Sequence, residues 1–150
     1  LDHCSEGHLI AEKVAESGFP AILGPDLSSR SKIEVQNMAF KTAGVLNHAG
    51  VKTAITTDHP VSLIQSLPLC AGLACKSGLS LEQAYLSITY YPAQILEVAD
   101  RVGSLENGKD ADIAIFSGNP MESFTETLYT ILEGEVIYAR NEKQKVRKKC

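Results

Sequence analysis

The chain has 150 residues and a formal net charge of −4, with 44% apolar and 21% charged residues. This balance is typical of a folded globular protein and excludes an intrinsically disordered chain, and no apolar run approaches the ~20 residues that a transmembrane helix requires. The charge is uneven, because residues 141–150 carry five Lys or Arg and one Glu, which leaves a net −8 on the other 140 residues.

The basic segment 141–150 has no aromatic or amphipathic pattern beside its charges. A basic tail could contact nucleic acid or an anionic membrane. We interpret it instead as a flexible, solvated C-terminus, and the acidic remainder argues against nucleic acid as the main partner. We likewise expect no membrane partner.

The predicted elements begin with a strand end. Leu1 to His3 have the pattern of residues that complete a strand, so we expect the chain to be part of a longer protein. Ser5 is a candidate N-cap for a helix that ends at Gly18. The apolar run from Phe19 to Leu23 predicts a buried strand, and the polar stretch 26–36 predicts a long loop.

The same alternation continues towards residue 100. We predict a helix over Met38–Ala49, although Gly44 weakens its middle, and a strand over Val51–Thr57. Further helices are predicted over Ser66–Lys76 and Leu81–Thr89, and Pro92 is placed as the first residue of another helical turn. Alternating strands and helices of this kind favour parallel strands in βα units.

The pattern changes after Asp100, where glycines separate short apolar runs. We predict strands over 111–116, 127–132 and 135–139, with the last two forming a hairpin through Glu133-Gly134. We therefore divide the chain into a region of βα units (1–102), a small antiparallel region (103–140) and the tail (141–150).

Candidate functional side chains follow two of the predicted strands. His3 comes directly after the first strand end, and Asp58 and His59 come directly after the strand that ends at Thr57. Because the carboxyl ends of parallel strands meet at one face of a barrel, these side chains can be neighbours in space. Imidazole nitrogen and carboxylate oxygen are suitable ligands for zinc or a similar divalent ion.

Each of these residues also has a structural interpretation. His3 could cap a loop, and Asp58 before His-Pro could open a turn. A carboxylate at Glu6 could complement the dipole of the helix that follows it. Glu34 could pair with Lys32 in a solvated loop. His48 is interpreted only as a favourable cation at a helix end.

The four cysteines are Cys4, Cys70, Cys75 and Cys150, and they form no C-x-x-C pair. In a chain without a signal peptide they indicate free thiols in a reducing compartment. We therefore expect a cytoplasmic protein.

Five segments resemble motifs of imidazolonepropionase-like amidohydrolases. The match covers nearly the whole chain except its tail, and Tyr91 stands where the family usually has Asn. The segments are Leu1–His8 (LDHCSEGH), Gly24-Pro25 with Arg30–Glu34 (RSKIE), Ala49–Pro60 (AGVKTAITTDHP), Thr89–Ala93 (TYYPA) and Val102–Ile113 (VGSLENGKDADI).

The resemblance implies an α/β fold: the last three strands of a distorted (β/α)8 barrel, followed by C-terminal strands of a small β-sandwich. It also implies a hydrolase of C–N bonds in cyclic amides or related small molecules, with one or two divalent ions, zinc being the first choice. Asp58 would bind the metal and transfer protons, and His3 would bind a second ion or orient the water. The residues expected to contact substrate are Glu6, His8, Arg30, Glu34 and His59.

A non-catalytic relative that keeps the fold as a binding or regulatory protein is the alternative, since fold does not determine function. The presence of both His3 and Asp58 argues against it. An incomplete barrel also leaves strand edges unpaired, so we expect the isolated chain to self-associate and to lack hydrolase activity.

Overall fold

The computed structural model describes residues 1–140, so the predicted tail 141–150 lies outside the described residues. Two short strands, β1 (Ala21–Leu23) and β2 (Thr53–Ile55), pair in parallel. All three residues of β2 are buried, as are both ends of β1. Burial on both faces is the usual condition of strands in a parallel sheet, which agrees with the predicted βα units.

The segment predicted as a strand end lies along the other edge of β1. It is not a regular strand, but Ile22 N donates to Leu1 O at 2.7 Å and Cys4 N donates to Ile22 O at 3.0 Å. Ala21, the residue before Ile22 in β1, forms its hydrogen bond on the opposite edge of β1, where its N donates to Lys52 O, just before β2. Three chain segments therefore lie side by side in the order 1–4, β1, β2.

The first helical stretch begins later than the sequence predicts. It consists of the 3₁₀ helix η1 (Gly7–Ile10) and α1 (Ala11–Glu16), and Gly18 follows with positive φ. The prediction that Ser5 is the N-cap is wrong. Ser5 is buried and its hydroxyl donates to Gly24 O, 19 residues along the chain, so a tertiary contact uses the group that a cap would need.

Helix α2 (Lys41–His48) follows the predicted polar loop, which contains a short 3₁₀ helix, η2 (Ile33–Val35). The predicted start at Met38 is three residues too early. Gly44 has a packing role, because a Cβ placed there would lie 3.0 Å from the carbonyl carbon of Gly78. The absence of a side chain lets α2 approach that backbone closely.

Three α-helices follow β2 in the described chain. A 3₁₀ helix, η3 (Ile64–Ser66), leads into the first of them, α3 (Leu67–Lys76). The second, α4 (Leu81–Ile88), is capped by Ser80, whose hydroxyl accepts from Gln83 N. Helix α5 (Tyr90–Ile95) starts two residues before Pro92, so the prediction that Pro92 is its first residue is wrong. Proline is still tolerated in this first turn, where backbone N–H groups have no helical partners.

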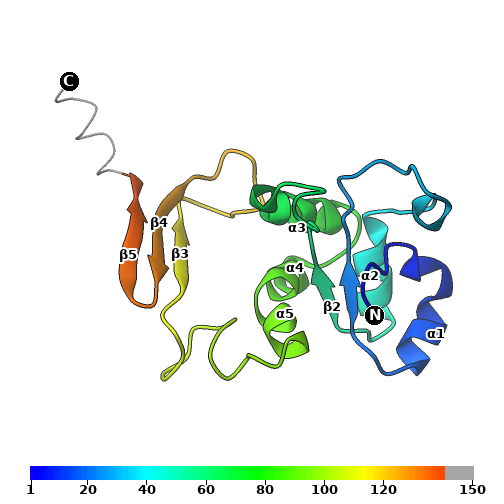
Figure 1. Cartoon of the computed structure of the whole chain (residues 1–150), viewed down its shortest axis with the longest axis horizontal. Helices are drawn as coiled ribbons and strands as arrows, with labels where there is room; N and C mark the ends of the chain where they lie inside the picture. Colours follow the sequence, from blue (N-terminus) through cyan, green and yellow to red (C-terminus); the bar gives the residue numbers. More distant parts are fainter. Residues whose placement is uncertain (141–150) are drawn as a thin grey trace.

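An antiparallel sheet of β3 (Ile113–Phe116), β4 (Thr127–Leu132) and β5 (Glu135–Ala139) completes the described chain. The predicted hairpin of β4 and β5 is confirmed, with Glu133 and Gly134 at positive φ in its turn. Figure 1 shows this sheet at one end of the molecule, with α3, α4 and α5 between it and the parallel pair.

The main core lies around the parallel pair and the helices packed on it. Among residues 1–140, no helix is long and apolar enough to cross a membrane. Cys4, Cys70 and Cys75 are free thiols, as predicted, and Cys150 falls outside the described residues. The largest side chains of the buried apolar cluster are Val14, Leu23, Leu46, Val51, Ile55, Leu79 and Met121.

Candidate functional site

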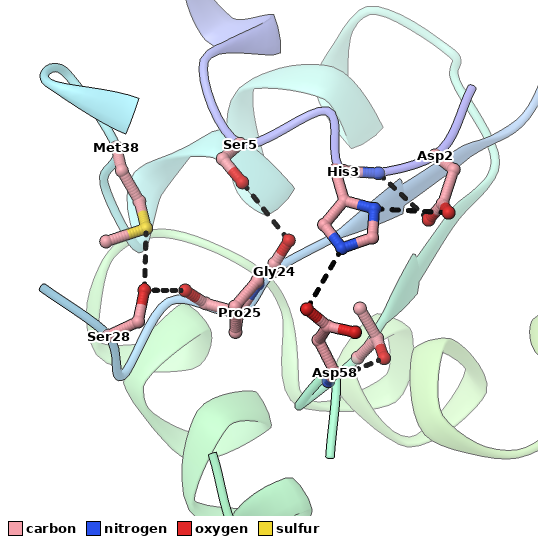
Figure 2. Close-up of polar contacts among 9 residues, drawn as sticks. Asp2, His3, Ser5, Gly24, Pro25, Ser28, Met38 and Asp58 are labelled. Carbon is pink, nitrogen blue, oxygen red and sulfur yellow. Dashed lines mark hydrogen bonds and ion pairs between the residues drawn. The ribbon is translucent and has the colours of Figure 1, made fainter. Parts of the chain in front are cut away.

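The structure brings His3 and Asp58 into contact at the carboxyl ends of the parallel strands. His3 lies in the segment 1–4 along one edge of β1, and Asp58 follows β2 on the other edge. His3 Nε2 lies 3.2 Å from Asp58 Oδ2, and both side chains are partly exposed (Figure 2). Two side chains 55 positions apart in sequence therefore form one polar centre.

Both residues have an unusual backbone conformation. His3 has φ of 54° and Asp58 has φ of 49°, a left-handed region that non-glycine residues adopt at a cost on the order of 1 kcal/mol. Strained backbone of this kind concentrates at functional sites. Only two other non-glycine residues in the described chain, Glu97 and Glu133, have positive φ, so its occurrence at both centre residues supports a functional interpretation.

A third residue, Asp2, belongs to the same centre, and the sequence analysis missed it. Asp2 Oδ2 lies 3.1 Å from His3 Nδ1, and Asp2 Oδ1 accepts from His3 N at 2.9 Å. Figure 2 shows the imidazole held between the carboxylates of Asp2 and Asp58. The only sequence signal was the Asp-His dipeptide, which occurs too often to be diagnostic.

The two carboxylates change the acid–base behaviour of His3. The hydrogen bond with Asp58 raises the pKa of His3 above its usual 6.5, and the charge of Asp2 adds to this effect. Partial burial acts in the opposite direction but does not outweigh them. Without a bound cation, the two carboxylates therefore stabilise the imidazolium form of His3 relative to an unpaired histidine.

The donor set also fits a divalent cation. Adjacent ligands of a tetrahedral zinc ion lie roughly 3.3 Å apart, given bond lengths of about 2.0–2.1 Å. The 3.2 Å between His3 Nε2 and Asp58 Oδ2 is close to that separation. Within residues 1–140, no group of three or more His, Cys, Asp or Glu side chains is placed to hold a metal, so His3 and Asp58 are the pair of side chains here that could contact one.

A hydrogen-bond framework positions the strand ends around this centre. Thr56 N donates to Leu23 O at 2.8 Å, and Asp58 N donates to Thr56 Oγ1 at 3.1 Å. Gly24 lies directly against Thr56, since a Cβ on Gly24 would come within 2.1 Å of Thr56 O. Only glycine permits this approach, which explains the glycine at the end of β1.

Two of the predicted substrate residues, Glu6 and His8, are engaged in local contacts. Glu6 Oε1 accepts from Asn37 N at 2.6 Å, which ties the start of η1 to the loop before α2. His8 Nδ1 lies 2.8 Å from Thr42 Oγ1. Burial, followed by the charge of Lys41, lowers the pKa of His8, and Glu6 opposes this shift.

The remaining predicted contact residues are Arg30, Glu34 and His59. All three are exposed, and their side chains make no hydrogen bond or ion pair with any other part of residues 1–140. The structure thus groups His3 with Asp58 and leaves these three as separate surface groups.

Asp26 is a second residue that the sequence analysis missed. It follows Gly24-Pro25 at the end of β1, and its Oδ1 is buried without a hydrogen-bond partner in the described chain. Burial raises the pKa of Asp26 to about 6. No local pattern distinguishes this aspartate from an ordinary turn residue, because its burial depends on the packing of distant segments.

Tyr91, the residue that departs from the expected motif, has partners of its own. Its hydroxyl donates to Gln83 Oε1 at 2.9 Å, and the same oxygen accepts from Asn47 Nδ2 at 2.8 Å. The ammonium of Lys52 lies 5.9 Å from the centre of the Tyr91 ring. These contacts tie α5 to α4 and to the residues before β2.

The model of the amidohydrolase family matches residues 5–138. An imidazolonepropionase of Cupriavidus necator is 32% identical over 119 residues, which are 77% of this chain and 27% of that protein. Amidohydrolase tasK of Hapsidospora irregularis is 28% identical over 130 residues, which are 79% of this chain and 12% of that protein. The chain spans about a quarter of the length of the imidazolonepropionases that it matches.

Solved structures show the same relationship. The crystal structure of an amidohydrolase from Thermotoga maritima MSB8 superposes with a TM-score of 0.88 at 32% identity, covering 93% of this chain and 36% of that one. E. coli guanine deaminase superposes with a TM-score of 0.67 at 18% identity, covering 93% of this chain and 38% of that one. The latter likeness concerns the fold alone.

Proposed function

This chain belongs to the amidohydrolase family, and from that premise we propose that the whole protein hydrolyses a C–N bond in a cyclic amide or a related small molecule. The observation that carries the proposal is the contact of His3 with Asp58 at the carboxyl ends of parallel strands. The imidazolonepropionase relatives support a small ring as substrate class. We place the protein in the cytoplasm, with no nucleic-acid or membrane partner.

We propose that the parallel strands form the last part of a (β/α)8 barrel and that β3, β4 and β5 belong to a small β-sandwich. The order 1–4, β1, β2 supports this, because consecutive parallel strands joined by helices are the repeating unit of such a barrel. Catalytic groups of these barrels lie at the carboxyl ends of the strands, where His3 and Asp58 are found.

Asp58 and His3 would hold a divalent cation, with zinc as the first choice. The ion would supply a bound water whose pKa is lowered towards ~7. One or two ions are compatible with the donors in this chain. In a one-ion site His3 would orient the water or polarise the substrate, and in a two-ion site it would be a ligand of the second ion.

Asp58 has the central chemical role in this proposal. Its carboxylate would accept a proton from the attacking water and then donate that proton to the leaving nitrogen. Asp2 would hold the His3 ring in the orientation that directs Nε2 towards Asp58. Glu6, His8, Arg30, Glu34 and His59 are our candidates for substrate contact around this centre.

Replacing Asp58 in the full-length protein tests the proposal. Asn keeps the size of the side chain but cannot act as the base, so Asp58→Asn should lower kcat by at least ~10²-fold. The matched control is Asp100→Asn, which removes an exposed carboxylate far along the chain and should leave kcat unchanged. Turnover of Asp58→Asn at the wild-type rate, with metal bound, would show that Asp58 is not catalytic.

A further inference from the structure

The hydrogen bonds around His8 determine which of its ring nitrogens carries a proton. Thr42 Oγ1 donates to Ser5 O at 3.0 Å, and a hydroxyl has only one hydrogen to donate. The 2.8 Å contact between Thr42 Oγ1 and His8 Nδ1 therefore has Nδ1 as the donor. In the neutral ring this leaves Nε2 unprotonated, with its lone pair free.

The neutral ring is also the form that this environment favours. Partial burial and the positive charge of Lys41 both disfavour the imidazolium, which lowers the pKa of His8. Nε2 makes no hydrogen bond to any residue between 1 and 140. His8 thus presents a hydrogen-bond acceptor that the described fold does not use.

The position of His8 connects it to the candidate site. Thr42, its partner, is buried in the first turn of α2, and Ser5 donates its own hydroxyl to Gly24 O at 3.2 Å. Gly24 directly follows β1, the strand that lies between the segments carrying His3 and Asp58. Figure 2 shows Ser5 and Gly24 beside this pair. The hydrogen bonds through Thr42 and Ser5 link His8 to the same end of the parallel strands.

We propose that His8 Nε2 accepts a hydrogen bond from the substrate, so the substrate carries an N–H or O–H group at this edge of the site. This inference rests on the proposed function and makes the substrate class narrower. The ring N–H of a cyclic amide provides such a donor. A substrate with only acceptor groups at this position would leave Nε2 without a partner, which is costly once the bound substrate excludes water from it.

Nitrogen NMR tests the inference without any turnover. Full-length Asp58→Asn protein with ¹⁵N-labelled histidine would be titrated with hydantoin, which has ring N–H groups, and with 1,3-dimethylhydantoin, which has none. We expect His8 Nδ1 to be protonated and Nε2 to be unprotonated, and we expect hydantoin alone to shift the Nε2 resonance. A protonated Nε2, no shift with hydantoin, or equal shifts with both compounds would overturn the inference.

Two substitutions separate a substrate contact from a structural role. His8→Asn keeps an N–H donor near the position of Nδ1 for Thr42 but removes the acceptor at Nε2. His8→Gln instead places its side-chain amide near the position of Nε2, where the amide oxygen can accept a hydrogen bond. We expect His8→Asn to lower kcat/KM about 10-fold, the scale of one lost hydrogen bond, and His8→Gln to lower it less. If His8→Asn retains wild-type kcat/KM, or if both variants lower Tm and kcat/KM equally, the role of His8 is structural.

The two proposals fail in distinguishable ways. The NMR experiment uses a protein in which Asp58 is already replaced, so its outcome does not depend on catalysis. A protonated Nε2 would remove the role of His8 and leave the assignment of Asp58 intact. Wild-type turnover by Asp58→Asn would instead remove the proposed mechanism, whatever the state of His8.

Discussion

Replacing Asp26 with Asn should stabilise the fold, and the gain should grow with pH. The carboxyl group of Asp26 is buried, its Oδ1 has no partner in the described chain, and its pKa is raised to about 6 from 3.8. A raised pKa means that the folded state binds the proton more tightly than the unfolded state. This group therefore favours folding at low pH and disfavours it once the carboxylate forms.

The magnitude follows from the difference in pKa. A difference of about 2 pKa units corresponds to about 3 kcal/mol when the group is ionised in both states, at 1.36 kcal/mol per unit. The unfolding free energy that the protein loses through Asp26 is small near pH 4, roughly 0.5 kcal/mol, and this loss reaches its full size above pH 7. Asn cannot ionise, so Asp26→Asn should recover on the order of 3 kcal/mol at pH 8 and little at pH 4.

The assay is urea unfolding of wild type and Asp26→Asn at several pH values between 4 and 8, with the difference in unfolding free energy plotted against pH. Asp100→Asn is the control, because an exposed carboxylate should change stability by less than about 0.5 kcal/mol at every pH. A difference that does not vary with pH, or a loss of stability at pH 8, would refute the reasoning. It would mean that the Asp26 carboxylate has a stabilising partner.

Three further predictions follow from the site and the strand edges. Asp2→Asn should lower kcat about 10- to 100-fold in the full-length protein with little change in Tm, because Asp2 orients His3; wild-type turnover would contradict this role. Gly24→Ala should cost at least about 3 kcal/mol in chemical denaturation, since its Cβ would meet Thr56 O. Gly18→Ala, also at positive φ but in open space, should cost only about 1 kcal/mol, and equal losses would exclude the steric explanation. The isolated chain should self-associate in light scattering, because in the described residues β2 pairs on one edge only. It should also show no zinc-dependent hydrolysis of cyclic amides, because two ligands hold zinc weakly. A monomer with metal-dependent turnover would contradict both expectations.

The elements that sequence patterns predict well are those determined by neighbouring residues. The hairpin of β4 and β5 follows from two short β-rich runs around Glu133-Gly134, and α4, predicted from Leu81, begins there after the Ser80 cap. Turn and cap chemistry acts over three or four residues, so it is visible in a short stretch of sequence. The same holds for the buried strands β1 and β2, whose apolar runs are bounded by glycine and polar residues.

The features that the sequence analysis missed depend on distant contacts. Ser5 has the chemistry of an N-cap, yet its hydroxyl is used by Gly24 across the fold. Asp26 looks like a turn residue, and only tertiary packing buries it. Proximity of His3 to Asp58 could be predicted from their placement at strand ends, but the participation of Asp2 depends on the backbone conformation of His3, which no spacing reveals.

The central claim is that Asp58 and His3 hold a catalytic cation, and anomalous X-ray scattering at the zinc edge tests it most directly. Crystals of the full-length protein, prepared under conditions in which the enzyme turns over, should show an ion about 2.0–2.2 Å from a carboxylate oxygen of Asp58. His3 Nε2 should either ligate an ion at about 2.0–2.1 Å or lie within hydrogen-bond reach of its water. An active protein whose ion is bound away from Asp58, or one that turns over with no ion at all, would contradict the account.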